Sequence, residues 1–341
     1  MDRLKIAVVG AGAVGGLLAW RLAQAGHAVS IIARGEHLRA IQASGLRLIE
    51  GADETIGERG VPNRIAIAAT ADPGDSTTTG GVQDLVVTGL KAHALPAVLS
   101  ALGPMLGPAT RVIPALNGVP FWYFDGPATL RTVDPAGLAA ISLAPGRVIG
   151  CVVHLAAEVV APGVIRHTGG RRLIFGEALA GTDLPTDERW SVHQVVETFR
   201  SAGFAAEHSS DIRREVWTKL IGNLSFNPVA AITGLRMDAL CADPAICALL
   251  RLLIDEGKAV AAALGVPLQI DADARIEMAR GLGGARISTL QDFEAHRQPE
   301  LGALVGAVIE LADRHGVSVP MLRQVYTLAV ARARALGLPG Y

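Results

Sequence analysis

The chain has 341 residues, of which 50% are hydrophobic and 18% are charged. This composition excludes an intrinsically disordered chain, and the length predicts two domains. Basic and acidic residues balance to a net charge of −1, so no basic excess indicates nucleic acid or an anionic membrane as the main partner. The three cysteines form no CxxC pair, which disfavours a disulfide framework or a structural zinc site.

The location expected from these features is a reducing cytoplasm. No stretch of the sequence is typical of a membrane-spanning helix. The apolar run 247–264 carries Arg251, Asp255, Glu256 and Lys258, which is the pattern of an amphipathic helix in a soluble domain.

The N-terminal part predicts alternating strands and helices. Residues 4–9 form an apolar strand, 10–16 a glycine turn, 17–25 a helix and 27–33 a second strand, which implies a parallel pair with a right-handed crossover. Further strands are expected at 45–49, 64–69, 84–88, 111–115, 148–158 and 163–176, with a polar loop at 72–81 and a helix at 92–102. This order predicts an α/β Rossmann domain with a doubly wound, mostly parallel sheet.

The C-terminal part predicts a mainly α-helical domain. Helical periodicity is found at 188–201, 212–224, 244–264, 271–280 and 300–315. We therefore expect a Rossmann domain over residues 1–209 and a helical substrate domain over 210–341, with the boundary near 209–211.

The glycine turn has the sequence of a dinucleotide-binding fingerprint. It is G-x-G-x-x-G, formed by Gly10, Ala11, Gly12, Ala13, Val14 and Gly15, and it joins a strand to a helix whose N-terminal amides can bind phosphates. The expected second strand ends in Arg34 rather than an acidic residue. A guanidinium suits a 2′-phosphate, which favours NADP(H), although the nearby Glu36 leaves NAD(H) open. The alternatives are a turn without a ligand and a solvated arginine.

Polar residues recur on one predicted helix face. Lys219, Asn223 and Asn227 are spaced i, i+4, i+8 among apolar neighbours, so they lie one turn apart. A lysine there can protonate the alkoxide that forms when a hydride reduces a ketone. The alternative is an internal hydrogen-bond network between helices.

Together these features resemble the ketopantoate reductase family. The resemblance spans nearly the whole chain and adds Leu90-Lys91-Ala92, Leu116-Asn117-Gly118, W-x-K-L-x-x-N-x-x-x-N-P at 217–228, and S-x-L-Q-D at 288–292 followed by Glu300. It implies NADPH-dependent reduction of 2-dehydropantoate to pantoate, on the route to pantothenate. It also implies a small 2-oxo acid as the partner molecule; a homodimer is an open possibility.

The resemblance also implies a role for each matching residue. Lys219 is the proton donor, and Glu300, expected one helix turn after the S-x-L-Q-D box, lies near the substrate hydroxyl. Asn223 and Asn227 hold the substrate, and Ser288 binds its carboxylate. The residues expected to face the cofactor are Lys91, Asn117 and, as a weaker match, Ala156.

Local alternatives remain for several of these residues. Lys91 can be a plain loop lysine, Asn117-Gly118 a turn, Ser288 a helix N-cap, and Glu300 a helix N-terminal residue.

The sequence departs from the family pattern at Thr289, where methionine is usual, in the aromatic segment 121–124, and in an expected insertion at 124–146. An aromatic segment in the pocket predicts a different 2-oxo or 3-hydroxy acid as substrate, and the alternative is core packing or a subunit contact. A third hypothesis is an NADP(H) sensor without turnover.

Overall fold

The computed structural model describes residues 3–51, 63–124, 129–143, 145–178 and 191–341. Contacts between its residues divide the chain into two compact units. The first comprises Met1–Leu116, Trp122–Ala128 and Gly137–Ile212, and the second Asn117–Phe121, Thr129–Ala136 and Arg213–Tyr341. Two short segments that the sequence placed in the first domain therefore belong to the second unit.

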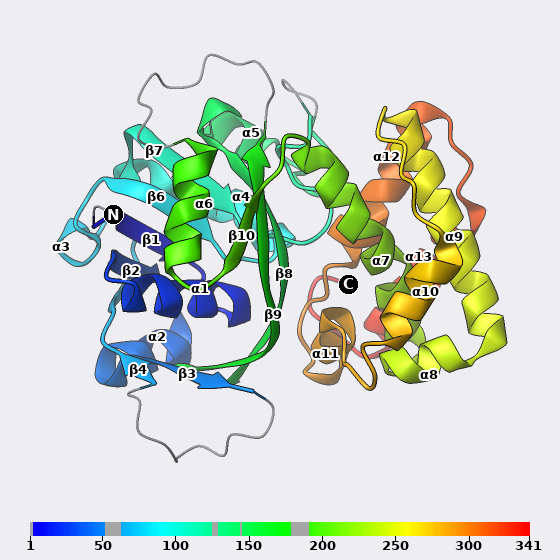
Figure 1. Cartoon of the computed structure of the whole chain (residues 1–341), viewed down its shortest axis with the longest axis horizontal. Helices are drawn as coiled ribbons and strands as arrows, with labels where there is room; N and C mark the ends of the chain where they lie inside the picture. Colours follow the sequence, from blue (N-terminus) through cyan, green and yellow to red (C-terminus); the bar gives the residue numbers. More distant parts are fainter. Residues whose placement is uncertain (1–2, 52–62, 125–128, 144, 179–190) are drawn as a thin grey trace. The chain divides into compact units, whose positions relative to one another are not determined.

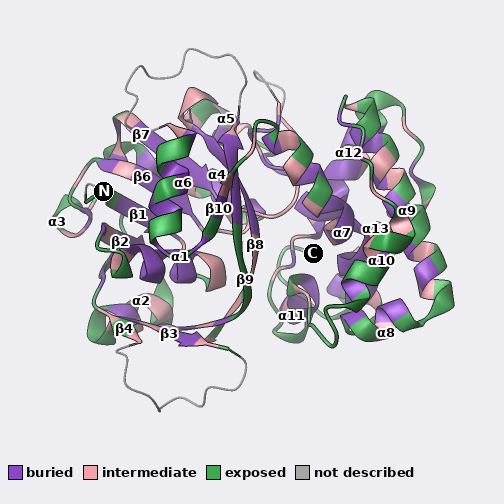
Figure 2. Ribbon diagram, viewed as in Figure 1, coloured by how far each residue is buried: buried purple, intermediate pink, exposed green. Residues whose placement is uncertain are grey.

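The first unit contains a parallel five-stranded sheet (Figure 1). Its order is β5 (Ala68–Thr70), β2 (Ala28–Ile32), β1 (Lys5–Val9), β6 (Gln83–Thr88) and β7 (Leu106–Pro114). All four pairings are parallel. Apolar strand residues are buried here, as Figure 2 shows for β1 and β6. The predicted Rossmann-type sheet is confirmed.

A second sheet packs on the same crossover helix. The hairpin of β8 (Ile149–Ala161) and β9 (Val164–Glu177) is antiparallel, and the order β10 (Ala205–His208), β9, β3 (Leu46–Glu50), β4 (Arg64–Ile65) completes it. Helix α1 (Ala13–Gln24) contacts strands of both sheets. The strands expected at 45–49, 148–158 and 163–176 therefore exist and belong to the second sheet, and isolated parallel bridges from Val148 to Val112 and from Cys151 to Ala115 also connect the start of β8 to the first sheet. The short turn between β8 and β9 can join antiparallel strands only.

Smaller elements differ from the prediction. The expected strand 64–69 splits into β4 and β5. The expected helix 92–102 is α4 (Leu95–Leu99) between 3₁₀ turns at Ala92–Ala94 and Ser100–Met105. The loop 72–81 contains α3 (Ser76–Thr79), capped by Asp75. The remaining helices of the unit are α2 (Gly35–Ser44), α5 (Leu138–Ser142), a 3₁₀ turn at Pro145–Arg147 and α6 (Val192–Ser201). Residues 125–128 and 144 of the expected insertion, and 188–190 of the expected helix, lie outside the described residues.

The second unit is helical over its main segment, as predicted. Its helices are α7 (Ile212–Thr233), α8 (Met237–Ala242), α9 (Pro244–Ala263), α10 (Ala272–Arg280), α11 (Ser288–Glu294), α12 (Ala307–His315) and α13 (Pro320–Ala335), with a π-helical turn at Gly302–Gly306. The prediction missed α8, α11 and α13. It also ended the helix at 224, whereas α7 runs through Pro228. Proline removes one helix hydrogen bond, but burial of Val229 to Ala231 stabilises the continuation. None of the described helices is long and apolar enough to span a membrane.

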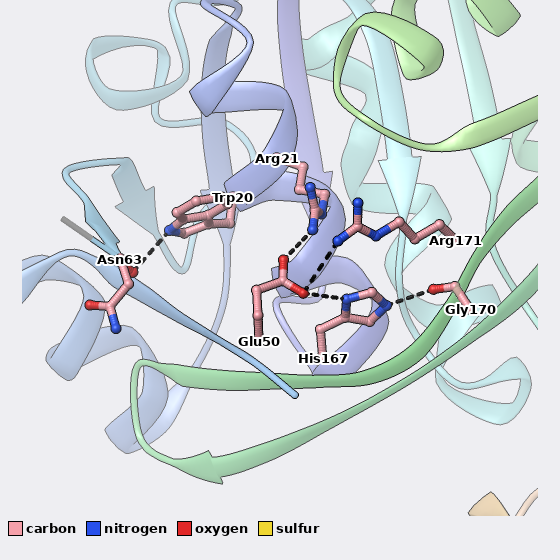
Figure 3. A network of polar contacts seen from close by, with 7 residues as sticks. All are labelled: Trp20, Arg21, Glu50, Asn63, His167, Gly170 and Arg171. Carbon is pink, nitrogen blue, oxygen red and sulfur yellow. Dashed lines mark hydrogen bonds and ion pairs between the residues drawn. The ribbon is translucent and has the colours of Figure 1, made fainter. Parts of the chain in front are cut away.

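A polar network links α1 to the second sheet (Figure 3). The buried Arg21 donates to Glu50, whose other oxygen lies 2.8 Å from Nδ1 of the buried His167. Nε2 of His167 lies 2.6 Å from the Gly170 carbonyl oxygen. Both ring nitrogens of His167 therefore face oxygen atoms, one of Glu50 and one of Gly170. Burial lowers the pKa of Arg21, and the Glu50 charge opposes that shift.

We expect Glu50→Gln to destabilise the first unit. The change leaves the buried Arg21 and His167 without their anion, and the loss of charge-assisted hydrogen bonds should cost about 2 kcal/mol, or roughly 4–8 °C in Tm. Calorimetry measures the shift. Glu207→Gln is the matched control, because its pair with Arg172 is half-exposed and should be worth less than about 1 kcal/mol. Equal Tm values for both variants would contradict the expectation.

Candidate active site

The glycine turn after β1 has the geometry of a phosphate cradle. Gly10 has φ +90°, which favours glycine. A Cβ on Gly15 would lie 2.0 Å from the Gly10 carbonyl oxygen, so only glycine permits this close approach of helix and turn. At Gly12, the N-cap of α1, the nearest atom to an added Cβ is 3.9 Å away. Packing within the chain therefore does not require glycine at 12, and the open space fits a pyrophosphate on the first-turn amides.

The other residues expected to face the cofactor lie on the first unit or at its edge. Arg34 is exposed directly after β2 and is the N-cap residue of α2. Lys91 follows the end of β6, and Ala156 is exposed on β8 beside a register shift. Gly10, Arg34 and Lys91 thus follow the carboxyl ends of three adjacent parallel strands, where open α/β sheets bind ligands.

A three-residue polar cluster lies within the second unit. Nζ of Lys219 donates to Oδ1 of Asn117 at 2.5 Å, and Nδ2 of Asn117 donates to Oε2 of Glu300 at 3.5 Å. One amide therefore bridges a cation and an anion. From the sequence, Asn117 was predicted to face the cofactor. Its direct contact with Lys219, which is 102 positions further along the chain, was not predicted.

Close backbone packing holds Asn117 in place. Gly118 has φ +86°, and a Cβ there would lie 2.4 Å from the Ala303 carbonyl oxygen. That same oxygen accepts the Val119 amide at 3.0 Å. Ala303 belongs to the π-helical turn that follows Glu300, and such turns are frequent at functional sites. The turn thus fixes both ends of the Asn117–Glu300 contact.

The two asparagines of the predicted stripe lie on α7 as expected. Asn223 is half-buried, and Asn227 is only 4% exposed. The internal network considered as an alternative exists at Lys219, through Asn117 and Glu300, but it does not include Asn223 or Asn227 among the described residues. Side-chain amides at a partly open position are suited to a ligand that carries oxygens.

The structure revises the surroundings of Ser288 and Glu300. Ser288 is exposed and is the first residue of α11, but Ile287 is the N-cap, so Ser288 does not cap this helix. Glu300 is not one helix turn after the S-x-L-Q-D box. A loop separates it from α11, and it precedes the helical segment that starts at Leu301. The reason is that α11 ends at Glu294 and His296 adopts φ +49°, which stops the helix.

The aromatic segment is mostly core. Trp122 is 6% and Tyr123 4% exposed, and Tyr123 packs edge-to-face on Phe124 with ring centroids 5.1 Å apart. A Cβ on Gly150 would lie 2.7 Å from the Trp122 ring, which shows how closely β8 packs on it. This geometry agrees with the core-packing alternative.

Glu310 ties the segment Thr129–Ala136 to α12. Its carboxylate accepts from the Arg131 amide, from the amide and hydroxyl of Thr132, and from Arg314. Thr132 in turn packs against Gly306 of the π-helical turn. Burial alone would raise the pKa of Glu310, but the hydrogen bonds from Thr132, Arg131 and Arg314 outweigh it and lower the pKa.

Comparisons with known proteins match both units. The family model for "Ketopantoate reductase PanE/ApbA" matches residues 6–179, and the model for its C-terminal part matches residues 211–333. A 2-dehydropantoate 2-reductase from Mesorhizobium japonicum is 43% identical, over 95% of this chain and 96% of that protein. A crystal structure of a protein described as a ketopantoate reductase from Ralstonia solanacearum superposes with a TM-score of 0.87 at 39% identity, covering 99% and 100% of the two chains.

A structure of D-mandelate dehydrogenase with NADH and anilino(oxo)acetate has a TM-score of 0.80 at 20% identity, covering 98% of this chain and 100% of that one. This likeness shows the fold alone.

Fold and family matches define an oxidoreductase with a Rossmann-like N-terminal domain and a helical C-terminal domain. The chain belongs to the ketopantoate reductase family.

The lowered pKa of Glu310 makes part of the stability pH-dependent. Because folding lowers this pKa from its ordinary 4.5, the stabilisation is present above about pH 4.5 and is lost as the pH falls through the lowered value. Glu310→Gln should therefore have a lower Tm than the parent at pH 7, and the difference should shrink toward pH 3. Asp313→Asn on the same helix is the control, because Asp313 contacts only an exposed arginine. A Tm difference independent of pH would contradict this expectation.

Proposed function

We propose that the protein is an NADPH-dependent 2-dehydropantoate 2-reductase that reduces ketopantoate to pantoate. The observation that carries the proposal is the Lys219–Asn117–Glu300 cluster, in which a lysine ammonium is hydrogen-bonded and held near an acidic residue inside a half-buried site. Family membership and the names of the relatives support the reaction.

The cofactor proposal rests on the glycine cradle. Gly10, Gly12 and Gly15, with the amides of Ala13 and Val14, would hold the pyrophosphate at the start of α1. Arg34 would bind the 2′-phosphate through charge-assisted hydrogen bonds. We assign cofactor contacts also to Ala11, Lys91, Asn117 and Ala156. When bound, the nicotinamide supplies the hydride for the 2-oxo carbon.

The proton comes from the protein. As the carbonyl carbon is reduced, its oxygen gains negative charge and takes a proton from Nζ of Lys219. Oδ1 of Asn117 accepts a hydrogen bond from one of the three N–H groups of this ammonium. The other two N–H groups point in other directions. Asn223, Asn227 and Glu300 orient the substrate hydroxyl and carbonyl, and Ser288 binds the carboxylate.

No observation favours a second candidate function. A different acid was predicted from the aromatic segment, but Trp122 and Tyr123 are buried in the first unit, so they do not argue for an enlarged pocket. An NADP(H) sensor would need no proton donor, and the hydrogen bond that holds Lys219 would have no purpose in it. A cytoplasmic location and a homodimer stay predictions.

We expect Lys219→Ala to lower kcat for ketopantoate reduction by roughly 10²–10⁴-fold, because general acid catalysis is worth that much. The affinity for NADPH, measured by fluorescence titration, should stay unchanged. The matched control is Lys258→Ala on α9, since Lys258 contacts only the exposed Asp255. Turnover by Lys219→Ala at the parental rate would refute the proposed proton donor.

Arg34→Ala tests the choice of nucleotide. Loss of the guanidinium–phosphate contact should raise KM for NADPH by roughly 10–100-fold and leave KM for NADH unchanged. Steady-state kinetics with both cofactors measure this, and Arg39→Ala, exposed on the same helix α2, is the control. Parallel changes with both cofactors would show that Arg34 does not distinguish them.

A further inference from the structure

Arg275 of α10 lies against α7 at a glycine. A Cβ on Gly222 would lie 2.1 Å from Nη2 of Arg275 and 2.9 Å from its Cζ. The guanidinium therefore occupies the space that a side chain at position 222 would fill. Gly222 is buried although it is on the partly exposed side of the helix. Because glycine has no side chain, the cation of Arg275 can lie directly on the α7 backbone at this position.

The contact lies beside the proposed substrate residues. Gly222 follows Lys219 by three positions and precedes Asn223, so it is one helical turn from the lysine. Lys219 and Asn223 are half-buried. The positive charge of Arg275, on α10, thus lies against the stretch of α7 that carries the proposed proton donor.

Arg275 has no anionic partner among the described residues. Its Nη1 meets only the sulfur of Met278, at 3.2 Å, and its Nε is buried without a hydrogen bond. Burial lowers its pKa, and no carboxylate opposes this. Asp271, one turn earlier, caps the Ala274 amide instead. Other arginines of this unit do pair with carboxylates, among them Arg251, Arg280, Arg286, Arg297, Arg314 and Arg323.

A half-buried guanidinium with a buried, unbonded Nε and no carboxylate partner weakens the folded state, because its partial desolvation is not fully offset by hydrogen bonds. Such a group is retained where it does something other than stabilise the fold. Its fork of N–H donors matches the two oxygens of a carboxylate. The environment of Arg275 is therefore that of an anion-binding residue without its anion.

We propose that Arg275 binds the carboxylate of the 2-oxo acid substrate. The proposal rests on the proposed function and deepens it. In a 2-oxo acid the carboxylate and the reacting carbonyl are on adjacent carbons. Lys219 on α7 would present a cation to the carbonyl, and Arg275 of α10, which lies against Gly222 one turn further along α7, would present one to the carboxylate. Ser288, which the family resemblance assigns to the carboxylate, supplies a hydroxyl but no charge. Arg275 would make the site selective for acids over neutral ketones.

The first test compares ketopantoate with its neutral cyclic ester, ketopantoyl lactone, which has the same 2-oxo group but no carboxylate. In Arg275→Met, kcat/KM for the acid should fall by roughly 30-fold or more, chiefly through KM, because a charged hydrogen-bonded contact is lost. The value for the lactone should change by less than about threefold on the same reasoning. Arg280→Met on the same helix, where Arg280 pairs with the exposed Glu277, should alter neither.

Stability distinguishes binding from a structural role. Arg275→Met removes a half-buried charge that has no carboxylate partner among the described residues, so its Tm should be equal to or above that of the parent. Gly222→Ala is a second variant, in which the new Cβ displaces the guanidinium while helix propensity improves. It should also lose activity on the acid without losing stability. A lowered Tm together with equal losses for acid and lactone would overturn the proposal.

A binding measurement separates this inference from the proposed function. Oxamate, an unreactive mimic of a 2-oxo acid, is titrated calorimetrically into parent and Arg275→Met, with and without NADP⁺. Binding that is at least about tenfold weaker in the variant supports Arg275 as the carboxylate ligand even if ketopantoate is not turned over. Equal binding to both proteins, or binding to neither, overturns it. Failure of the parent to reduce ketopantoate would instead refute the proposed function.

Discussion

The hydrogen bond from Lys219 to Asn117 is the contact on which the candidate site depends. It joins α7 to a five-residue segment that leaves the Rossmann-type chain and folds with the helical unit. The Val119 amide and the tight packing of Gly118 on Ala303 hold that segment against the π-helical turn. Glu300, directly before this turn, completes the cluster. The proposed proton donor, Lys219 on a regular helix, is therefore held by residues that are remote in the sequence.

Glycines at close approaches have two distinct uses in this chain. At Gly15 and Gly118 the missing side chain lets backbone meet backbone, and any Cβ would collide with a carbonyl oxygen. At Gly12 and Gly222 the missing side chain leaves room for something else: open space at the start of α1, and a guanidinium on α7. The first kind is required by the fold. Of the second kind, Gly12 leaves open space that we propose for a cofactor pyrophosphate, whereas Gly222 is needed because the guanidinium of Arg275 occupies the place of a side chain.

The two units differ in whether a desolvated arginine has a carboxylate partner. Around α1, the buried Arg21 pairs with the carboxylate of Glu50, which also lies at hydrogen-bond distance from His167, so the buried arginine of this network is neutralised within the protein. On α7 and α10, Arg275 has no such carboxylate among the described residues. An enzyme that reduces an anionic substrate gains from keeping a cation unpaired until the substrate arrives, at some expense in stability.

The sequence by itself determined the local structures and their chemistry. Strand, glycine turn and helix at residues 4–25, the i, i+4, i+8 stripe on α7 and the family resemblance all follow from neighbouring residues, because periodicity and turn chemistry are short-range. Only the tertiary structure decided which distant residues meet. The split of residues 64–70 between two sheets, Asn117 beside Lys219 and Arg275 on Gly222 depend on packing between elements far apart in the chain. Asp271, one helical turn before Arg275, is the N-cap of α10 and accepts the Ala274 amide, and this use of its carboxylate is likewise visible only in the folded chain.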